Sequence, residues 1–245
     1  EDELTDLAAT FNGLIGRLRD SLQRERRFRA DAAHNMFTPL TAIQSELDVT
    51  LRNPRSEDEY REVLSTVQGH TETLSSLLEE LMTLSRIEAR DDRSTTSLID
   101  VSRQVEARIP RARQAPPEGA SIEWQGDSGI EAPVSREDLN LMVDHLLDNA
   151  LKYTPEEGHI TVQAVEKETD VVLSVSDSGI GFDAKAADRL FERFYRTGPA
   201  EQYADGGGLG LSIVSAIAES YGGTVTARSM GANAGSTFEV RVPAR

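Results

Sequence analysis

The N-terminal part of the chain carries two long stretches whose apolar residues recur at helical spacing and form a single stripe. These stretches span residues 28–51 and 60–87, and Pro54 lies in the turn between them. Ser56 with Glu59 fits the capping box that starts a helix. One helical hairpin leaves its apolar stripe uncovered, so we expect a homodimer that packs two hairpins as an antiparallel four-helix bundle.

Charge and composition exclude several classes of protein. The 245 residues include 26 Lys and Arg against 42 Asp and Glu, which gives a formal charge of −16. Nucleic acids and anionic membrane surfaces attract basic proteins, so we predict no nucleic-acid partner and no direct membrane binding. The absence of cysteine excludes disulfides, thiolate metal sites and cysteine nucleophiles. No apolar run approaches the roughly 20 residues that a membrane-spanning helix needs.

The pattern changes near residue 90, after a polar segment without periodicity. Most glycines lie in residues 98–245, where strand-like and helix-like patterns alternate and predict an α+β sandwich. We expect helices at 137–153 and 212–221, and strands at 122–124, 160–165, 171–175, 224–227 and 237–242.

Two glycine clusters in this second half are candidates for phosphate binding. One begins at Asp177, directly after a predicted strand, and the other begins at Gly206 and opens a predicted helix. Glycines at a helix start let backbone N–H groups approach phosphate, and the helix dipole favours the anion. Either cluster alone is more often a simple turn.

The predicted helix 137–153 adds polar residues at unusual positions. His145 and Asn149 are four residues apart and share one face. An amide oxygen can ligate Mg²⁺ that bridges phosphates, and Lys152 can neutralise them. The alternative is that Asn149 is a hydrogen-bonded core amide and Lys152 a solvated charge.

The order of these three elements resembles the ATP-binding domain of sensor histidine kinases, which belong to the GHKL ATPases. Residues 190–196 and 235–238 resemble the phenylalanine-bearing box and the last glycine motif of that domain. The resemblance implies a GHKL-type α/β sandwich over residues 98–245, with ATP and Mg²⁺ as cofactors.

The resemblance also implies roles for individual residues. Asp177 would accept a hydrogen bond from the adenine amino group, with Gly179, Gly181 and Thr237 supporting the same pocket, and Asn149 would bind Mg²⁺. The other residues expected at the nucleotide are His145, where the family more often has Asn, Lys152, Tyr153, Arg193, Phe194, Arg196, Gly206, Gly208, Leu209, Gly210 and Leu211.

Two parts of this assignment concern the transferred phosphoryl group. Arg193 and Arg196 are expected to stabilise its charge, although a solvated basic turn is the alternative. Residues 194–207 are expected to form a lid over the nucleotide.

Residues 28–43 resemble the phosphoacceptor box of the same kinases, with His34 as the acceptor. A lone histidine on a helix is usually structural or solvated, but here the surrounding residues match the box. Pro39 is expected to bend the helix near the ring. Thr38 lies one turn after His34 and could position a water for phosphatase activity.

The box departs from the family pattern directly after the histidine. The family usually has Glu or Asp at this position, and here Asn35 occupies it. An amide cannot act as a general base near neutral pH. We therefore hypothesise that autophosphorylation is weak or depends on another base, while phosphotransfer or phosphatase activity at His34 and Thr38 persists.

The start of the chain resembles the second helix of a HAMP signalling module, with a generic dimeric coiled coil as the alternative. Its first helix, and any membrane span, would lie upstream of residue 1. The expected domains are a HAMP-like helix (1–20), the dimerisation and phosphoacceptor hairpin (21–90), a linker (91–97) and the ATP-binding domain (98–245).

These features together predict the cytoplasmic core of a sensor histidine kinase from an inner or plasma membrane. The predicted reaction is ATP-dependent autophosphorylation of His34, followed by transfer to an aspartate of a response regulator. Two alternatives remain: a kinase-impaired response-regulator phosphatase, favoured by Asn35, and a non-catalytic dimeric scaffold whose nucleotide domain only regulates conformation.

Overall fold

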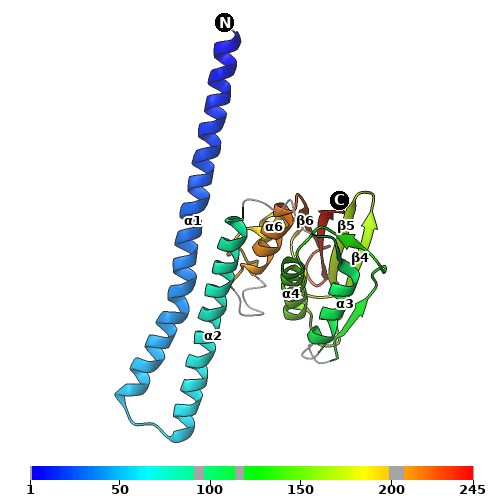
Figure 1. Cartoon of the computed structure of the whole chain (residues 1–245). Helices are drawn as coiled ribbons and strands as arrows, with labels where there is room; N and C mark the ends of the chain where they lie inside the picture. Colours follow the sequence, from blue (N-terminus) through cyan, green and yellow to red (C-terminus); the bar gives the residue numbers. More distant parts are fainter. Residues whose placement is uncertain (1, 91–96, 114–118, 199–206, 245) are drawn as a thin grey trace. The chain divides into compact units, whose positions relative to one another are not determined.

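The computed structural model describes residues 2–90, 97–113, 119–198 and 207–244 (Figure 1). They form two compact units, Glu1–Ser75 and Ser76–Arg245, which are described separately. No helix in the described ranges is both long and apolar enough to cross a membrane.

The first unit consists of α1 (Asp2–Arg52) and the first part of α2 (Glu57–Glu88). Pro39 is buried and lies inside α1, which continues as a helix through it. The predicted capping box is confirmed, because the Ser56 N–H donates to the Glu59 carboxylate (2.7 Å) and the Glu59 N–H donates to Ser56 Oγ (3.3 Å). The Ser56 hydroxyl also donates to the Glu59 carboxylate (2.8 Å), and the two hydrogen bonds that the carboxylate accepts from Ser56 lower the pKa of Glu59.

The apolar stripe of this unit stays largely uncovered within one chain. Leu51 is 80% exposed and Leu64 is 61% exposed, and Leu40, Leu47 and Tyr60 are more than one third exposed. A stripe of large apolar side chains in contact with water is destabilising unless another surface covers it.

A five-stranded sheet forms the centre of the second unit, in the order β2-β4-β5-β7-β6. The β2–β4 pair is parallel, and the other neighbouring pairs are antiparallel. The strands are β2 (Ser121–Trp124), β4 (His159–Lys167), β5 (Asp170–Asp177), β6 (Thr224–Arg228) and β7 (Ser236–Pro243).

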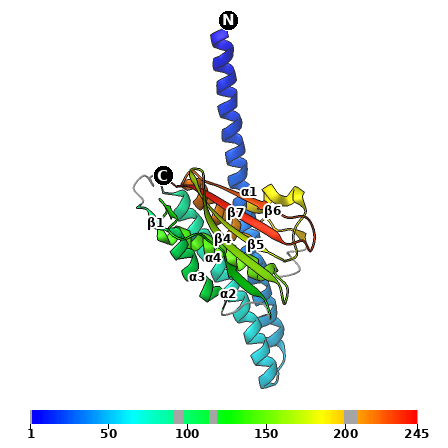
Figure 2. The same cartoon turned by 90° about the vertical axis from the view of Figure 1, so that its right-hand side faces the viewer.

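Helices cover one face of this sheet (Figure 2). They are α3 (Val101–Ala112), α4 (Arg136–Tyr153) and α6 (Gly210–Ser220). The 3-10 helix η1 (Ala184–Phe191) contacts β6, and β1 (Ile99–Asp100) pairs with β3 (Glu131–Ala132) as a separate ribbon. The result is the predicted two-layer α/β sandwich.

The core lies between α4, α6 and the sheet. Alternate residues of β4 are buried, as expected for a strand with one covered face. The residues of α4 predicted to face inward are all at most 3% exposed: Leu139, Val143, Leu146, Leu147 and Ala150.

Four elements of this unit were not predicted from the sequence: α3, η1, β1 and β3. α3 is short and contains Pro110, although Val101, Val105 and Ile109 recur at helical spacing, and η1 lacks the regular i→i+4 bonding of an α-helix. The two short strands pair only with each other. The helix predicted at 212–221 begins two residues earlier, at Gly210.

Truncation of Leu146, which is fully buried between α4 and the sheet, should destabilise the second unit. We expect Leu146→Ala to lower the free energy of unfolding by about 2–5 kcal/mol. Denaturant unfolding followed by the fluorescence of the single tryptophan, Trp124 in β2, measures this loss. Leu98→Ala, at a 53% exposed leucine, is the matched control and should change stability by about 0.5 kcal/mol or less. Equal effects of the two variants would contradict this packing.

Candidate functional site

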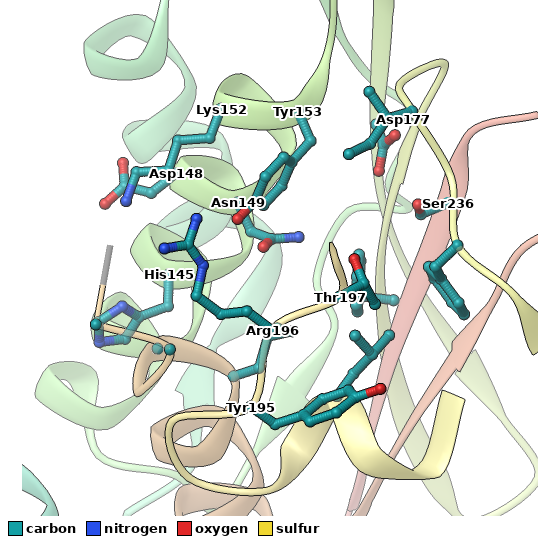
Figure 3. A pocket seen from close by; sticks show the side chains of 18 of the residues that line it. His145, Asp148, Asn149, Lys152, Tyr153, Asp177, Tyr195, Arg196, Thr197 and Ser236 are labelled. Carbon is teal, nitrogen blue, oxygen red and sulfur yellow. The ribbon is translucent and has the colours of Figure 1, made fainter. Parts of the chain in front are cut away.

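A cavity in the second unit lies between α4, the end of β5 and the segments on either side of η1 and α6 (Figure 3). It brings together ten of the residues predicted from the sequence: His145, Asn149, Lys152, Tyr153, Asp177, Gly181, Arg196, Gly208, Gly210 and Leu211. Residues from distant parts of the chain therefore converge on one pocket.

Asp177 forms one end of this cavity, at the last position of β5. Its side chain is buried, and one carboxylate oxygen accepts a hydrogen bond from the Gly179 N–H (2.8 Å). Burial raises the pKa of the Asp177 carboxyl, while backbone hydrogen bonds from Gly179 and Ser236 act in the opposite direction. A buried carboxylate with remaining acceptor capacity is suited to bind a polar N–H group of a ligand.

The two glycines after Asp177 are required by close backbone packing. A Cβ atom on Gly179 would collide with the carbonyl oxygen of Tyr153, and one on Gly181 would collide with that of Gly231. Gly181 also has a positive φ of 61°. The cluster therefore ties the end of β5 to the end of α4.

The other end of the cavity carries the polar face of α4. His145, Asp148, Asn149 and Lys152 line this end; in Figure 3 the Lys152 side chain lies beside Asp148, whereas the Asn149 amide points away from them, towards Thr197. The Nε2 atom of His145 is buried and has no hydrogen-bond partner among the described residues. Burial lowers the pKa of His145, which keeps the imidazole neutral near pH 7.

The glycines at the start of α6 allow this helix to approach His145. A Cβ atom on Gly210 would lie 3.0 Å from His145 Nδ1, so a larger residue would crowd the ring. No side chain caps the N-terminus of α6 at Leu209. Backbone N–H groups at such a terminus, together with the helix dipole, favour an anion.

Five predicted residues lie in the described ranges but do not line the cavity. Leu209 is fully buried. Gly179 and Thr237 support the end of the cavity that Asp177 forms, where the hydroxyls of Thr237 and Ser176 share a hydrogen bond (2.9 Å). Phe194 has a positive φ of 61°, and its N–H donates to the Gly208 carbonyl (2.9 Å). Arg193 forms an ion pair with Glu88 of α2.

Most of the predicted lid lies outside the described residues, since these include 194–198 and 207 but not 199–206. Gly206 is therefore not placed. The described lid residues that line the cavity are Tyr195, Arg196, Thr197 and Gly207. The guanidinium of Arg189 stacks over the Tyr195 ring at 4.2 Å.

Two cavity residues from the second half of α2, Ser76 and Glu80, were not predicted from the sequence. Burial raises the pKa of Glu80, and its Oε2 atom has no hydrogen-bond partner in the described part of the chain. No local signal marks them, because both belong to an ordinary amphipathic pattern. Phe182 follows the end of β5 and Phe238 lies near the start of β7; both line the cavity and could have been inferred from their neighbours.

The candidate phosphoacceptor residues lie in the first unit, on α1. His34 is exposed, and Thr38 Oγ1 donates to the His34 carbonyl oxygen (3.1 Å). The Asn35 amide donates to the carbonyl oxygen of Asp31 (2.8 Å). The imidazole is thus accessible to a second reactant.

Both regions match known families. Residues 24–90 match the His Kinase A (phospho-acceptor) domain, and residues 134–245 match the histidine kinase-, DNA gyrase B- and HSP90-like ATPase family. The sensor protein IrlS of Burkholderia pseudomallei is 32% identical over 99% of this chain and 52% of its own length. The chain spans about half the length of the curated relatives it matches.

Solved structures show the same fold. The histidine kinase AdeS of Acinetobacter baumannii is 25% identical, with a TM-score of 0.62 over 86% of this chain and 98% of that one. The histidine kinase ThkA, solved in complex with the response regulator protein TrrA, has a TM-score of 0.70 at 20% identity over 93% of this chain and 64% of that one.

A phosphoacceptor hairpin followed by an ATP-binding sandwich defines the core of a histidine kinase. The two matches show that this chain contains the phosphoacceptor and ATP-binding domains of the histidine kinase core.

If Asp177 binds the adenine amino group, Asp177→Asn should weaken ATP binding by about 10- to 100-fold, because a charged hydrogen-bond acceptor is lost. Calorimetric titration of the whole chain with ATP measures this loss. Asp170→Asn, at the opposite end of the same strand, is the matched control and should bind ATP as the wild type does. Unchanged affinity of Asp177→Asn would contradict the assignment.

The same variant tests the raised pKa of Asp177 without any ligand. A carboxyl whose pKa is raised on folding stabilises the fold at low pH, and this contribution is lost as the pH rises through its folded pKa. At pH 7 the ligand-free Asp177→Asn chain should therefore be at least as stable as the wild type. Its advantage should shrink towards pH 4, which thermal unfolding at several pH values measures.

Proposed function

We propose that this chain transfers the γ-phosphoryl group of ATP to His34 and then to an aspartate of a response regulator. The observation that carries the proposal is the cavity that gathers Asp177, Asn149, Lys152 and the start of α6, in a chain that also exposes His34 on a matched phosphoacceptor helix.

The cavity residues divide between the two ends of the nucleotide. Asp177 would accept a hydrogen bond from the adenine amino group, in a pocket where water competes little because the carboxylate is buried. Lys152 and the N–H groups that begin α6 would bind the phosphates. Arg196, which lines the same cavity, would stabilise charge on the transferred group.

Asn149 is the residue that fits a magnesium ion. Its amide oxygen is a hard ligand, and Mg²⁺ commonly binds proteins through one or two oxygen ligands while phosphates and water complete its shell. Within the described residues no group of three or more His, Asp or Glu side chains could hold a metal ion. When bound, the ion would neutralise phosphate charge.

His145 would act as a neutral hydrogen-bonding group beside the phosphates, in place of the more usual amide. Its buried and unpartnered Nε2 atom is a polar group whose desolvation a bound nucleotide could offset. Because burial lowers its pKa, the ring would not add a positive charge.

The assembly that we propose is a homodimer in which the apolar stripes of two hairpins form a four-helix bundle. The exposed Leu51 and Leu64 support it, since one chain leaves them in water.

The response-regulator partner is supported by ThkA, which was solved with such a protein. We also keep the proposed division into a HAMP-like helix (1–20), hairpin (21–90), linker (91–97) and ATP-binding domain (98–245), within the cytoplasmic part of a membrane-bound sensor.

Incubation of the whole chain with γ-labelled ATP tests the reaction. The wild type should acquire an acid-labile, alkali-stable label, and His34→Ala should lose it because the nucleophile is gone. His70→Ala removes the other helical histidine of the hairpin and should keep the label. A label that persists in His34→Ala would overturn the proposed acceptor.

A second candidate function, response-regulator phosphatase without autokinase activity, is favoured by Asn35. Thr38 uses its hydroxyl hydrogen in the bond to His34, so its oxygen can still accept a hydrogen bond from water. If this candidate is correct, the wild-type chain binds ATP without becoming labelled, yet removes phosphate from a phosphorylated response regulator, and Thr38→Ala slows that removal. Rapid self-labelling of the wild type would exclude this candidate.

A further inference from the structure

Phosphorylation of His34 requires a group that takes up a proton, and the next side chain in the sequence cannot do so. A neutral imidazole has one nitrogen with a free lone pair and one N–H. When the lone pair attacks phosphorus, the ring becomes cationic and the other nitrogen must lose its proton. The amide of Asn35 is not a base at neutral pH.

The helical neighbours of His34 include one ionisable side chain. Residues three and four positions away on a helix lie next to each other, and here these are Ala30, Asp31, Phe37 and Thr38. Only Asp31 among them can accept a proton near neutral pH.

The direction of side chains on a helix favours Asp31 further. Each Cα–Cβ bond tilts towards the N-terminus, so a side chain covers the turn that precedes it. The same tilt is observed at two neighbouring positions, where the Asn35 amide reaches back to the Asp31 carbonyl (2.8 Å) and the Thr38 hydroxyl reaches back to the His34 carbonyl (3.1 Å). From this tilt we expect the ring of His34 to lie over the turn that contains Asp31.

The carboxylate of Asp31 is available for this role. The side chain is exposed, and it forms no hydrogen bond or ion pair with any residue in the described part of the chain. The Asn35 amide binds the backbone of residue 31 and leaves its carboxylate unengaged.

We propose that Asp31 is the proton acceptor for His34, a role that rests on the proposed autokinase function. A nitrogen–phosphorus bond forms at the ring nitrogen with the lone pair, and the bond from Pγ to the β–γ bridging oxygen of ATP breaks. ADP leaves with that oxygen and the electron pair. The proton of the other ring nitrogen passes to the Asp31 carboxylate, which later releases it to water.

The test is the initial rate of labelling by γ-labelled ATP in the whole chain, for the wild type and Asp31→Asn. We expect a decrease of about 100-fold, at the lower end of the range for loss of a general base. Asp48→Asn is the matched control, because residue 48 is exposed on nearly the same face of α1 as His34, 14 residues or about 21 Å further along than His34. Glu72→Gln is a second control for a carboxylate on α2, which accepts a hydrogen bond from Gln68 (2.8 Å). Both controls should label at the wild-type rate.

Two further measurements separate proton transfer from a structural role. Between pH 7 and 9 the wild-type rate should stay nearly constant, whereas the Asp31→Asn rate should rise because hydroxide replaces the missing base. The double variant Asp31→Asn, Asn35→Glu should be labelled at least 10-fold faster than Asp31→Asn alone. ATP affinity should be the same in all variants, since none of these residues lines the nucleotide cavity.

The outcomes of these experiments distinguish the role of Asp31 from the proposed function itself. Equal labelling of Asp31→Asn and Asp48→Asn, with His34→Ala unlabelled, overturns the role of Asp31 and leaves the proposed function standing. A wild type that is unlabelled until Asn35→Glu is introduced also overturns it, because no base would then be present. Label that does not depend on His34 refutes the proposed function itself.

Discussion

The contact between the end of β5 and the end of α4 is the constraint on which the nucleotide cavity depends. The Ile180 N–H donates to the Tyr153 carbonyl (3.1 Å), and only glycine fits at position 179 against the same carbonyl. This contact places Asp177 beside the last turn of α4, which carries Lys152. The sheet and the helix are both rigid, so the distance between the two ends of the cavity is set by the fold rather than by loops.

The groups proposed to bind the nucleotide and the group proposed to be phosphorylated belong to different units. In the second unit polar side chains are buried and their pKa values change, as Asp177 and His145 show. In the first unit His34 is exposed on a helix that continues through Pro39. A buried binding site holds one reactant in a fixed position, while an exposed acceptor can meet both a nucleotide and a partner protein.

Local patterns predicted much of the fold and of the site. The period of α4, the alternation of β4 and the capping box of Ser56 and Glu59 depend on residues close in sequence, and all three are found in the structure. The elements that escaped prediction, such as α3 and η1, are short or irregular and stabilised by tertiary contacts. Glu80 was not predicted for a related reason, since its sequence context is like that of the exposed glutamates of α2 and only its position at the cavity distinguishes it.

The sequence by itself determined which residue types are present at each motif, including the amide of Asn35 where a carboxylate is usual, and it indicated the order of helices and strands. Only the tertiary structure decided which of these residues meet. It placed Arg193 against Glu88 rather than in the cavity, and it left Nε2 of His145 buried without a partner. The physical reason is that burial and pairing depend on residues distant in sequence, which a local pattern does not encode.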